Sequence, residues 1–120
     1  MATALIVEDV QTDLLILTSY LEAAGCRVVA AIDGESALSH LSTNKPDIVF
    51  LDVVLPGRSG FEICREIKSQ SETHKIPVVM CSTKNTDLDR FWGLKQGADF
   101  YLTKPVDRSD LLAALKKLLE

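Results

Sequence analysis

The sequence predicts an α/β fold built on an open, doubly wound sheet of five parallel strands, with five helices distributed over both faces. Two observations predict this fold class. Short apolar segments alternate five times with segments of helical periodicity, the pattern of parallel strands joined by helical crossovers. The segment Ile48–Leu51 is continuously apolar, as expected for a strand buried on both faces. A chain of 120 residues suits one domain over residues 1–120 and is too short for a β/α barrel.

The first strand is expected at Ala4–Val7, an apolar run that ends abruptly in Glu8 and Asp9. Leucines at helical spacing predict a helix over Gln11–Ala24, and Gly25 is a suitable C-terminal stop. The acidic pair therefore lies between the carboxyl end of the strand and the start of the helix.

The second strand and helix follow directly. Cys26–Ala31 contains two β-branched valines, which favour a strand. Asp33 is a candidate N-cap of a helix that reaches about Leu41. A polar turn at residues 44–47 then leads into the third strand, Ile48–Leu51.

Ser59 and Glu62 match a capping box at the start of a third helix, which continues to about Ser69. The apolar run Ile76–Cys81 predicts the fourth strand. Pro77 is tolerated near its start because a missing N–H matters least there.

The last elements complete the alternation. A helix over Thr86–Gln96 has the weakest support, because Gly93 inside it costs about 1 kcal/mol relative to alanine. The fifth strand is expected at Ala98–Leu102. Asp107 or Ser109 is a candidate cap of the final helix, in which leucines form an apolar stripe.

The composition is that of an ordinary globular domain, with 47% hydrophobic and 25% charged residues. The net charge of −4 and the scattered lysines and arginines argue against nucleic-acid binding. No apolar run approaches the roughly 20 residues that span a bilayer, and the N-terminus lacks a signal-peptide pattern, so we expect a cytoplasmic protein that does not engage a membrane. The odd number of separated cysteines favours reduced thiols: Cys26, Cys64 and Cys81.

Polar side chains that could bind a ligand or take part in a reaction follow four of the five predicted strands. They are Glu8 and Asp9, Asp52, Ser82 and Thr83, and Thr103 and Lys104. In an open parallel sheet, ligands bind beyond the carboxyl ends of the strands, so these side chains are expected at one edge. This convergence is the strongest functional signal in the chain.

Three carboxylates at one edge repel one another and stay ionised most readily around a hard cation, for which Mg²⁺ is well suited. A carboxylate can also act as a nucleophile towards phosphorus and form an aspartyl phosphate. Lys104 and Ser82 are suitable partners for the phosphoryl oxygens. The chain has no glycine-rich phosphate-binding loop, which argues against direct binding of ATP.

The order of these residues resembles the receiver domain of bacterial two-component response regulators, and the resemblance covers nearly the whole chain. The matching positions are Glu8-Asp9, Asp52, Ser82-Thr83, Tyr101 and Lys104-Pro105. The resemblance implies a flavodoxin-like sheet with strand order 2-1-3-4-5. It also implies a signalling switch that shows no independent substrate turnover.

For the site, the resemblance implies that Asp52 accepts a phosphoryl group from a phosphohistidine of a histidine kinase or phosphotransfer protein. Asp9, Asp52 and the backbone carbonyl of Val54 would ligate Mg²⁺ or Mn²⁺. Glu8 would act on the metal mainly through water.

The resemblance also implies a switch and an output surface. Ser82 and Lys104 would engage the phosphoryl oxygens, and Ser82 would move towards them while Tyr101 turns inward. A downstream protein would bind the fourth helix, fifth strand and fifth helix, with Phe91, Trp92 and Tyr101 in the contact. Only one of the two rings on the fourth helix is expected at the surface.

Two positions differ from the best-studied members of this family. Val54 is apolar where those members carry a polar amide, and Lys84 is basic where they carry an acid. Both lie where water attacking the phosphoryl group would be positioned, so the departures bear on the lifetime of the aspartyl phosphate.

Simpler interpretations exist for the same residues. Glu8 and Asp9 could serve only the dipole of the following helix, and Ser82 or Thr83 could cap the fourth helix. Tyr101 could be an ordinary core residue.

Three functions therefore stand as hypotheses: a stand-alone regulator of the chemotaxis or motility kind, a receiver excised from a larger regulator or hybrid kinase, and a small Mg²⁺-dependent phosphohydrolase. The phosphohydrolase would usually carry a second acid two residues after its nucleophile, where this chain has Val54.

Overall fold

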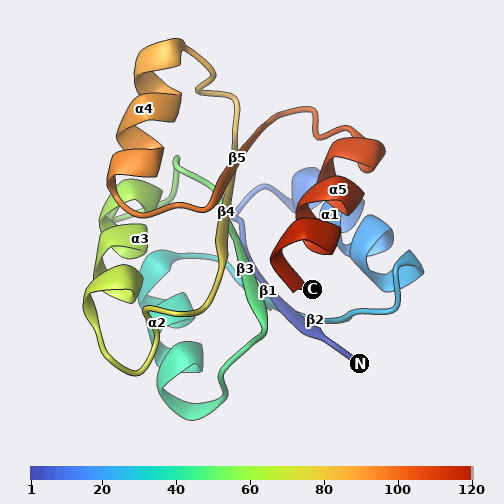
Figure 1. Cartoon of the computed structure of the whole chain (residues 1–120), viewed down its shortest axis with the longest axis horizontal. Coiled ribbons are helices and arrows are strands. Elements are labelled where there is room, and N and C mark those ends of the chain that lie inside the picture. Colours follow the sequence, from blue (N-terminus) through green and yellow to red (C-terminus); the bar gives the residue numbers. More distant parts are fainter. Residues whose placement is uncertain (120) are drawn as a thin grey trace.

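The computed structural model describes residues 1–119 and has five parallel strands in the order β2-β1-β3-β4-β5, which confirms the predicted fold class (Figure 1). The strands are β1 (Thr3–Val7), β2 (Arg27–Ala31), β3 (Ile48–Leu51), β4 (Val78–Ser82) and β5 (Phe100–Thr103). The helices are α1 (Gln11–Ala23), α2 (Gly34–Thr43), α3 (Gly60–Ser69), α4 (Asp87–Lys95) and α5 (Arg108–Leu119). Every predicted element is present, with ends that differ by a few residues.

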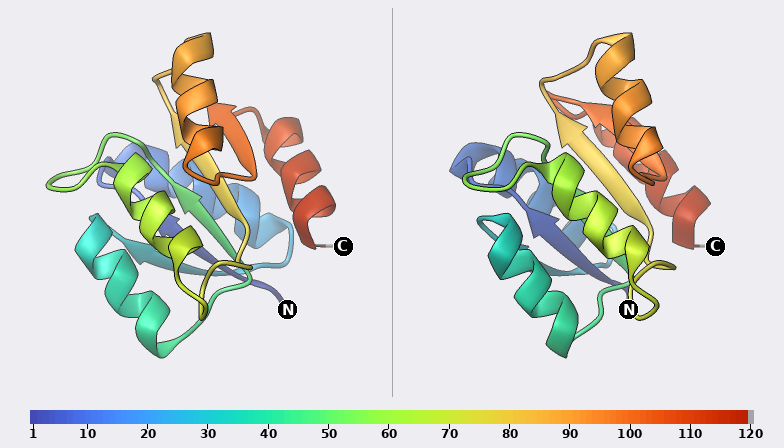
Figure 2. Two further views of the ribbon diagram at one scale, coloured as in Figure 1. Left: turned by 60° about the vertical axis from the view of Figure 1, so that its left-hand side comes forward. Right: turned by 90° about the vertical axis from the view of Figure 1, so that its left-hand side faces the viewer.

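The helices form two layers on opposite faces of the sheet, with α1 and α5 on one face and α2, α3 and α4 on the other (Figures 1 and 2). Successive residues of a strand point to opposite faces, so each central strand supplies both layers. In β1, Leu5 packs into the core beneath α2 and α3, whereas Ile6 packs into the core beneath α1 and α5. This double burial explains why β3 is apolar at all four of its positions.

The helix N-termini follow the predicted capping chemistry with two exceptions, at α3 and α4. The Asp33 side chain accepts from the N–H of Ser36, and the Ser59 hydroxyl accepts from the N–H of Glu62. This second bond is one half of the predicted capping box, and the return bond from the Ser59 N–H to the Glu62 side chain is not formed. The fourth helix is capped by Thr86, which forms a reciprocal capping box with Asp89. The alternative that Ser82 or Thr83 caps this helix is therefore wrong, because these residues lie upstream of the loop that ends at Thr86.

Two strand boundaries also differ from the prediction. The fourth strand begins at Val78 rather than Ile76, because Pro77 has no N–H and contributes only its carbonyl, which accepts from Val49. The fifth strand begins at Phe100 rather than Ala98 and extends to Thr103, which lies opposite Ser82. The later end brings Lys104 directly to the edge of the sheet.

Gly93, the weak point of the predicted fourth helix, has a packing role. A Cβ atom at this position would lie 2.9 Å from a ring carbon of Tyr101 and 3.0 Å from the sulfur of Met80. Gly93 therefore leaves the space that the Tyr101 ring occupies, and the tertiary contact outweighs the low helix propensity of glycine.

The three cysteines are buried and free, as predicted. Burial raises the pKa of the Cys64 thiol to about 12 and raises the pKa of the Cys81 thiol further. Both thiols therefore stay protonated and unreactive at neutral pH.

Over residues 1–119, none of the helices combines the length and the apolar character that crossing a membrane would require.

A second close approach ties α3 to the loop after β3. A Cβ atom at Gly60 would lie 2.0 Å from the carbonyl oxygen of Asp52, and the Gly60 N–H donates to the carbonyl of Val53 at 2.8 Å. The first turn of α3 therefore rests directly on the backbone that carries Asp52.

We predict that Gly60→Ala lowers the free energy of unfolding by about 2 kcal/mol or more, because the added methyl group must displace the backbone around Asp52. Urea unfolding measures this loss. Gly25→Ala is the control: it strains a residue with φ of 90° but meets no atom within 4 Å, so its cost should be about 1–2 kcal/mol. An equal or smaller loss in Gly60→Ala would contradict the close approach.

Candidate functional site

The register of the sheet brings the predicted site residues to one edge. Val7 pairs with Leu51 at the end of β1 and β3, so Glu8 and Asp52 leave the sheet side by side. Ser82 pairs with Thr103 at the end of β4 and β5, and the Lys104 N–H donates to the Ser82 carbonyl at 2.9 Å. Parallel strands end at the same edge, so residues from distant parts of the sequence meet there.

Lys104 is the centre of this site. Its Nζ lies 2.6 Å from Oε1 of Glu8, 2.8 Å from Oδ2 of Asp52 and 2.9 Å from Oδ2 of Asp13. The Lys104 side chain is only 8% exposed, and those of Glu8 and Asp52 are 1% and 5% exposed. The lysine therefore joins the carboxyl ends of β1, β3 and β5 through largely buried ion pairs.

The Asp52 carboxylate is buried, and each of its two oxygens accepts one hydrogen bond. Lys104 donates to Oδ2, and the backbone N–H of Val54 donates to Oδ1 at 3.1 Å. An unpaired carboxylate at this depth would cost roughly several kcal/mol, and these two donors offset part of that cost. The Asp52 N–H donates to the carbonyl of Val7, which holds the carboxylate against β1.

Glu8 and Asp9 occupy different environments although they are neighbours in the sequence. Glu8 is almost completely buried, whereas Asp9 is exposed to solvent. Burial raises the pKa of Glu8 to about 7, the hydrogen bond from Lys104 opposes this shift, and the charge of Asp52 adds to it. Glu8 is therefore poised to exchange a proton near neutral pH.

The Lys104 ammonium stays charged. Burial alone would lower its pKa, but the hydrogen bonds to Asp52, Glu8 and Asp13 outweigh burial and raise the pKa above its ordinary value. A permanent positive charge at the edge of the sheet is suited to hold an anionic group.

The site residues also form a candidate metal centre. One carboxylate oxygen from each of Glu8, Asp9 and Asp52 lies within 4.8 Å of the others. An oxygen-only set that combines buried and exposed carboxylates suits a hard cation that keeps some of its waters, as Mg²⁺ does. The chemistry of the donors therefore fits the predicted ion.

Ser82 and Tyr101 lie beside this centre. The Ser82 side chain is fully buried, and its hydroxyl accepts from the N–H of Lys84 at 3.2 Å. The Tyr101 hydroxyl donates to the carbonyl of Lys84. Both side chains thus bind the same residue of the loop between β4 and α4, and neither is a hydrogen-bond partner of Lys104 Nζ in the described chain.

The exposure of the aromatic residues differs from the prediction in two ways. Phe91 and Trp92 are both exposed, at 59% and 49%, so neither ring of α4 is buried in the core. Tyr101 is only 8% exposed, so it is not a surface residue in this conformation. In the structure the Tyr101 ring lies beside Gly93 of α4, and its turning inward on phosphorylation stays a prediction.

Sequence reasoning missed Asp13, which lies in the first turn of α1 and binds Lys104. The available signal was its position: Asp13 lies in the first turn of the helix that follows the first strand, and so lies close to the edge where that strand ends. Sequence reasoning also missed Gly60, whose role depends on a contact that no local pattern reveals.

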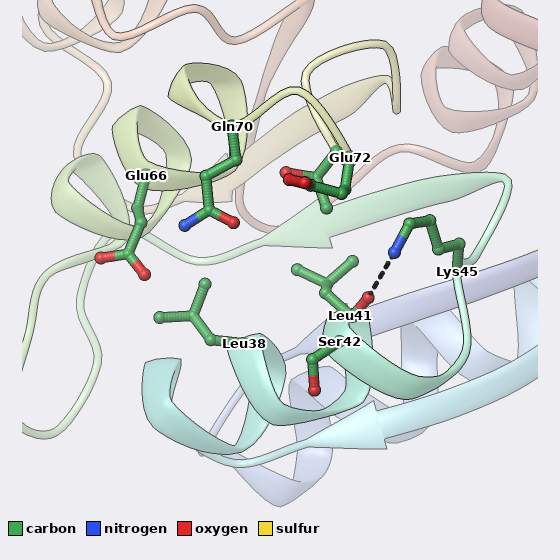
Figure 3. Close-up of a pocket in the computed structure, with 8 residues that line it drawn as sticks. Leu38, Leu41, Ser42, Lys45, Glu66, Gln70 and Glu72 are labelled. Carbon is green, nitrogen blue, oxygen red and sulfur yellow. Dashed lines mark hydrogen bonds between the residues drawn. The ribbon is translucent and has the colours of Figure 1, made fainter.

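A separate hollow of about 370 Å³ lies between α2 and the end of α3 (Figure 3). Leu38 and Leu41 face it from α2, and its polar neighbours include Glu66 and Lys45. Lys45 donates to the backbone carbonyl of Leu41, and Glu66 forms an ion pair with Arg58, so both side chains have partners within the chain. The hollow shares no residue with the carboxylate cluster, which remains the candidate site.

A comparison with family models identifies residues 4–116 as a response regulator receiver domain. The chain belongs to this family. The protein is therefore a receiver domain of two-component systems, a signalling switch rather than an enzyme that turns over an independent substrate. The family assignment leaves the phosphohydrolase alternative without support.

The receiver domain is similar to proteins of two architectures. It is 41% identical to Protein PilH of Pseudomonas aeruginosa over 119 residues, which cover 99% of this chain and 98% of PilH. It is 38% identical to Response regulator PleD of Caulobacter vibrioides over 117 residues, 98% of this chain but only 26% of PleD.

Solved structures agree with the fold. A response regulator from Chloroflexus aurantiacus is 33% identical, with a TM-score of 0.95 and coverage of 98% of this chain and 97% of that one. The receiver domain of a sensor histidine kinase from Pseudomonas aeruginosa PAO1, which has a magnesium ion coordinated in its active-site cleft, is 27% identical, with a TM-score of 0.90 and coverage of 98% and 96%. The chemotaxis response regulator CheY4 of Vibrio cholerae is 30% identical, with a TM-score of 0.90 and 98% coverage of both chains.

We predict that the metal-free receiver domain becomes less stable as the pH rises through Glu8's titration. The folded-state pKa of about 7 lies above the ordinary value of 4.5, so the folded chain binds more protons between these values. The contribution of Glu8 to the free energy of unfolding is therefore greatest below pH 4.5. This contribution, up to roughly 3 kcal/mol, is lost as the pH rises through 7. Urea unfolding in the presence of a chelator measures the slope, and Glu8→Gln should flatten it. An equal slope in that variant would refute the assignment.

We also predict that Lys104→Met destabilises the metal-free chain by about 3–5 kcal/mol, because it leaves Glu8 and Asp52 without their cation. Millimolar Mg²⁺ should restore part of this loss, since a divalent ion among the same carboxylates replaces the missing charge. Lys116→Met, which removes a lysine from the last turn of α5, is the control and should change stability little. If Mg²⁺ did not stabilise Lys104→Met more than wild type, the idea that the ion replaces the charge of Lys104 among these carboxylates would be contradicted.

Proposed function

We propose that Asp52 is the phosphoacceptor of a phosphorylation-activated switch and that its donor is a phosphohistidine of a histidine kinase or phosphotransfer protein. The main support for this proposal is the pair of contacts at Lys104. Its ammonium group lies within hydrogen-bond distance of Glu8, which follows β1, and of Asp52, which follows β3. Asp52 contacts this ammonium and also accepts from the backbone N–H of Val54 in the following loop.

The transfer moves one phosphoryl group between two side chains. A carboxylate oxygen of Asp52 attacks phosphorus, the bond between phosphorus and the imidazole nitrogen of the donor breaks, and the imidazole leaves with that electron pair. The Lys104 ammonium then donates to a phosphoryl oxygen and offsets the added negative charge, which is roughly one to two units. Hydrolysis of the aspartyl phosphate by water returns Asp52 to its free carboxylate.

We assign the metal to Asp9, Asp52 and the backbone carbonyl of Val54, with Glu8 acting through water. When bound, Mg²⁺ or Mn²⁺ would neutralise phosphoryl charge and orient the phosphoryl oxygens. The exposure of Asp9 favours an ion that exchanges with solvent, and the burial of Glu8 favours an indirect contact. The magnesium ion in the cleft of the related kinase receiver domain supports this choice of metal.

We propose that Ser82 and Tyr101 transmit the state of Asp52 to the loop after β4. Their hydroxyls bind the backbone N–H and carbonyl of Lys84, so a movement of Ser82 towards the phosphoryl group removes one of two bonds on the same residue. Because Tyr101 already lies inward, phosphorylation would increase the population of an existing orientation rather than create a new one.

The output surface proposed here is α4 with β5 and α5. Leu88, Phe91, Trp92 and Leu94 are all more than 45% exposed on α4, which is an unusual density of apolar side chains for one short helix. We propose that a downstream protein binds this surface. We also propose a cytoplasmic location, where the chain could reach both its kinase and its target. A partner responds to the switch only if it binds one state better, typically by about 1–3 kcal/mol.

We predict that Asp52→Asn abolishes labelling by acetyl phosphate in the presence of Mg²⁺, because the variant lacks the attacking carboxylate. Intact-mass measurement counts the phosphoryl groups bound. Asp110→Asn, an exposed acid in the first turn of α5, is the matched control and should be labelled like wild type. Labelling of Asp52→Asn at the wild-type stoichiometry would exclude Asp52 as the acceptor.

A further inference from the structure

Asp13 is the one member of the Lys104 cluster that has no place in the proposed transfer. Its Oδ2 lies 2.9 Å from Lys104 Nζ, a distance similar to those from Nζ to Glu8 and Asp52. Its side chain is 31% exposed, whereas the side chains of Glu8 and Asp52 are at most 5% exposed. Asp13 is also absent from the group of three acids that could hold a metal ion.

The hydrogen-bonding capacity of Lys104 limits what the site can do. An ammonium group has three donors and no acceptor, and the three carboxylates use one donor each. A phosphoryl oxygen can gain its own hydrogen bond from Lys104 only when one of these contacts is given up or shared.

The three contacts differ in what their loss would cost. Glu8 is buried, so breaking its bond would leave a carboxylate without a cation inside the protein. Asp52 carries the phosphoryl group and stays beside Lys104. Asp13 reaches solvent, so water can replace the ammonium at its carboxylate for little free energy. The bond to Asp13 is therefore the one that opens most readily.

We propose that Asp13 is a positioning residue that competes with the phosphoryl group for Lys104 and thereby restrains phosphorylation of Asp52. In the unmodified chain it occupies the donor that the phosphoryl oxygens need, and its negative charge also disfavours an incoming phosphoryl donor. The inference rests on the proposed function of Asp52. It connects the first turn of α1 to the state of the site, because Asp13 belongs to that helix.

The test measures the initial rate of phosphoryl incorporation by intact mass, with acetyl phosphate and Mg²⁺, in Asp13→Asn, Asp13→Ala and Asp13→Glu. The first two variants should be labelled about threefold to fivefold faster than wild type, the range expected for one partly exposed charge pair. Asp13→Glu keeps the charge and should return the rate to within about twofold of wild type.

Asp87→Asn is the matched control, because it removes an exposed acid from the first turn of another helix, α4, and should leave the rate unchanged. A merely structural role for Asp13 would lower the stability or the labelling rate and would not produce a gain. Equal or slower labelling of Asp13→Asn, with wild type labelled normally, would overturn the competition. If wild type itself takes up no phosphoryl group, the acceptor assignment fails and this inference falls with it.

Discussion

The interaction on which the site depends is the set of hydrogen bonds from Lys104 Nζ to Glu8, Asp13 and Asp52. One buried cation makes it possible to place several carboxylates at the edge of an apolar sheet without metal. The pKa of Glu8 lies close to neutral pH, because burial and the charge of Asp52 raise it while the hydrogen bond from Lys104 lowers it. The cluster is therefore held together while remaining sensitive to any change of charge at Asp52.

The fold produces this arrangement through the geometry of parallel strands. All five strands end at the same edge, and the order β2-β1-β3-β4-β5 places β1 and β3 side by side in the middle of the sheet. Asp52 follows a strand that is apolar at every position, because helices cover both of its faces. The first polar residue after such a strand is thus presented at the edge, where the neighbouring strands supply its partners.

Two glycines connect this edge to the rest of the molecule. Gly60 allows α3 to rest on the backbone of Asp52, and Gly93 allows the Tyr101 ring to lie beneath α4. Tyr101 in turn binds the residue that also donates to Ser82. Backbone and side-chain contacts therefore lead from Lys104 through Ser82 and Lys84 to Tyr101, whose ring lies beside Gly93 of α4.

Much of this organisation is determined by the sequence itself. The alternation of apolar runs and helical segments determines the α/β class. The polar residues after four of the five runs determine which side chains reach the edge, because a strand buried on both faces cannot tolerate them earlier. Glu8, Asp9, Asp52 and Lys104 could be chosen as site residues on this basis alone. The strand order came from resemblance to a family, since local periodicity contains no information on which strands are neighbours.

Only the tertiary structure decided how these residues share charge. The burial of Glu8 beside an exposed Asp9, the third carboxylate from Asp13 and the inward position of Tyr101 all arise from contacts between segments distant in sequence. The need for glycine at positions 60 and 93 has the same origin, because in each case the space is set by a different element of the chain. Local propensity describes a residue and its neighbours along the chain, whereas these features depend on atoms brought close by folding.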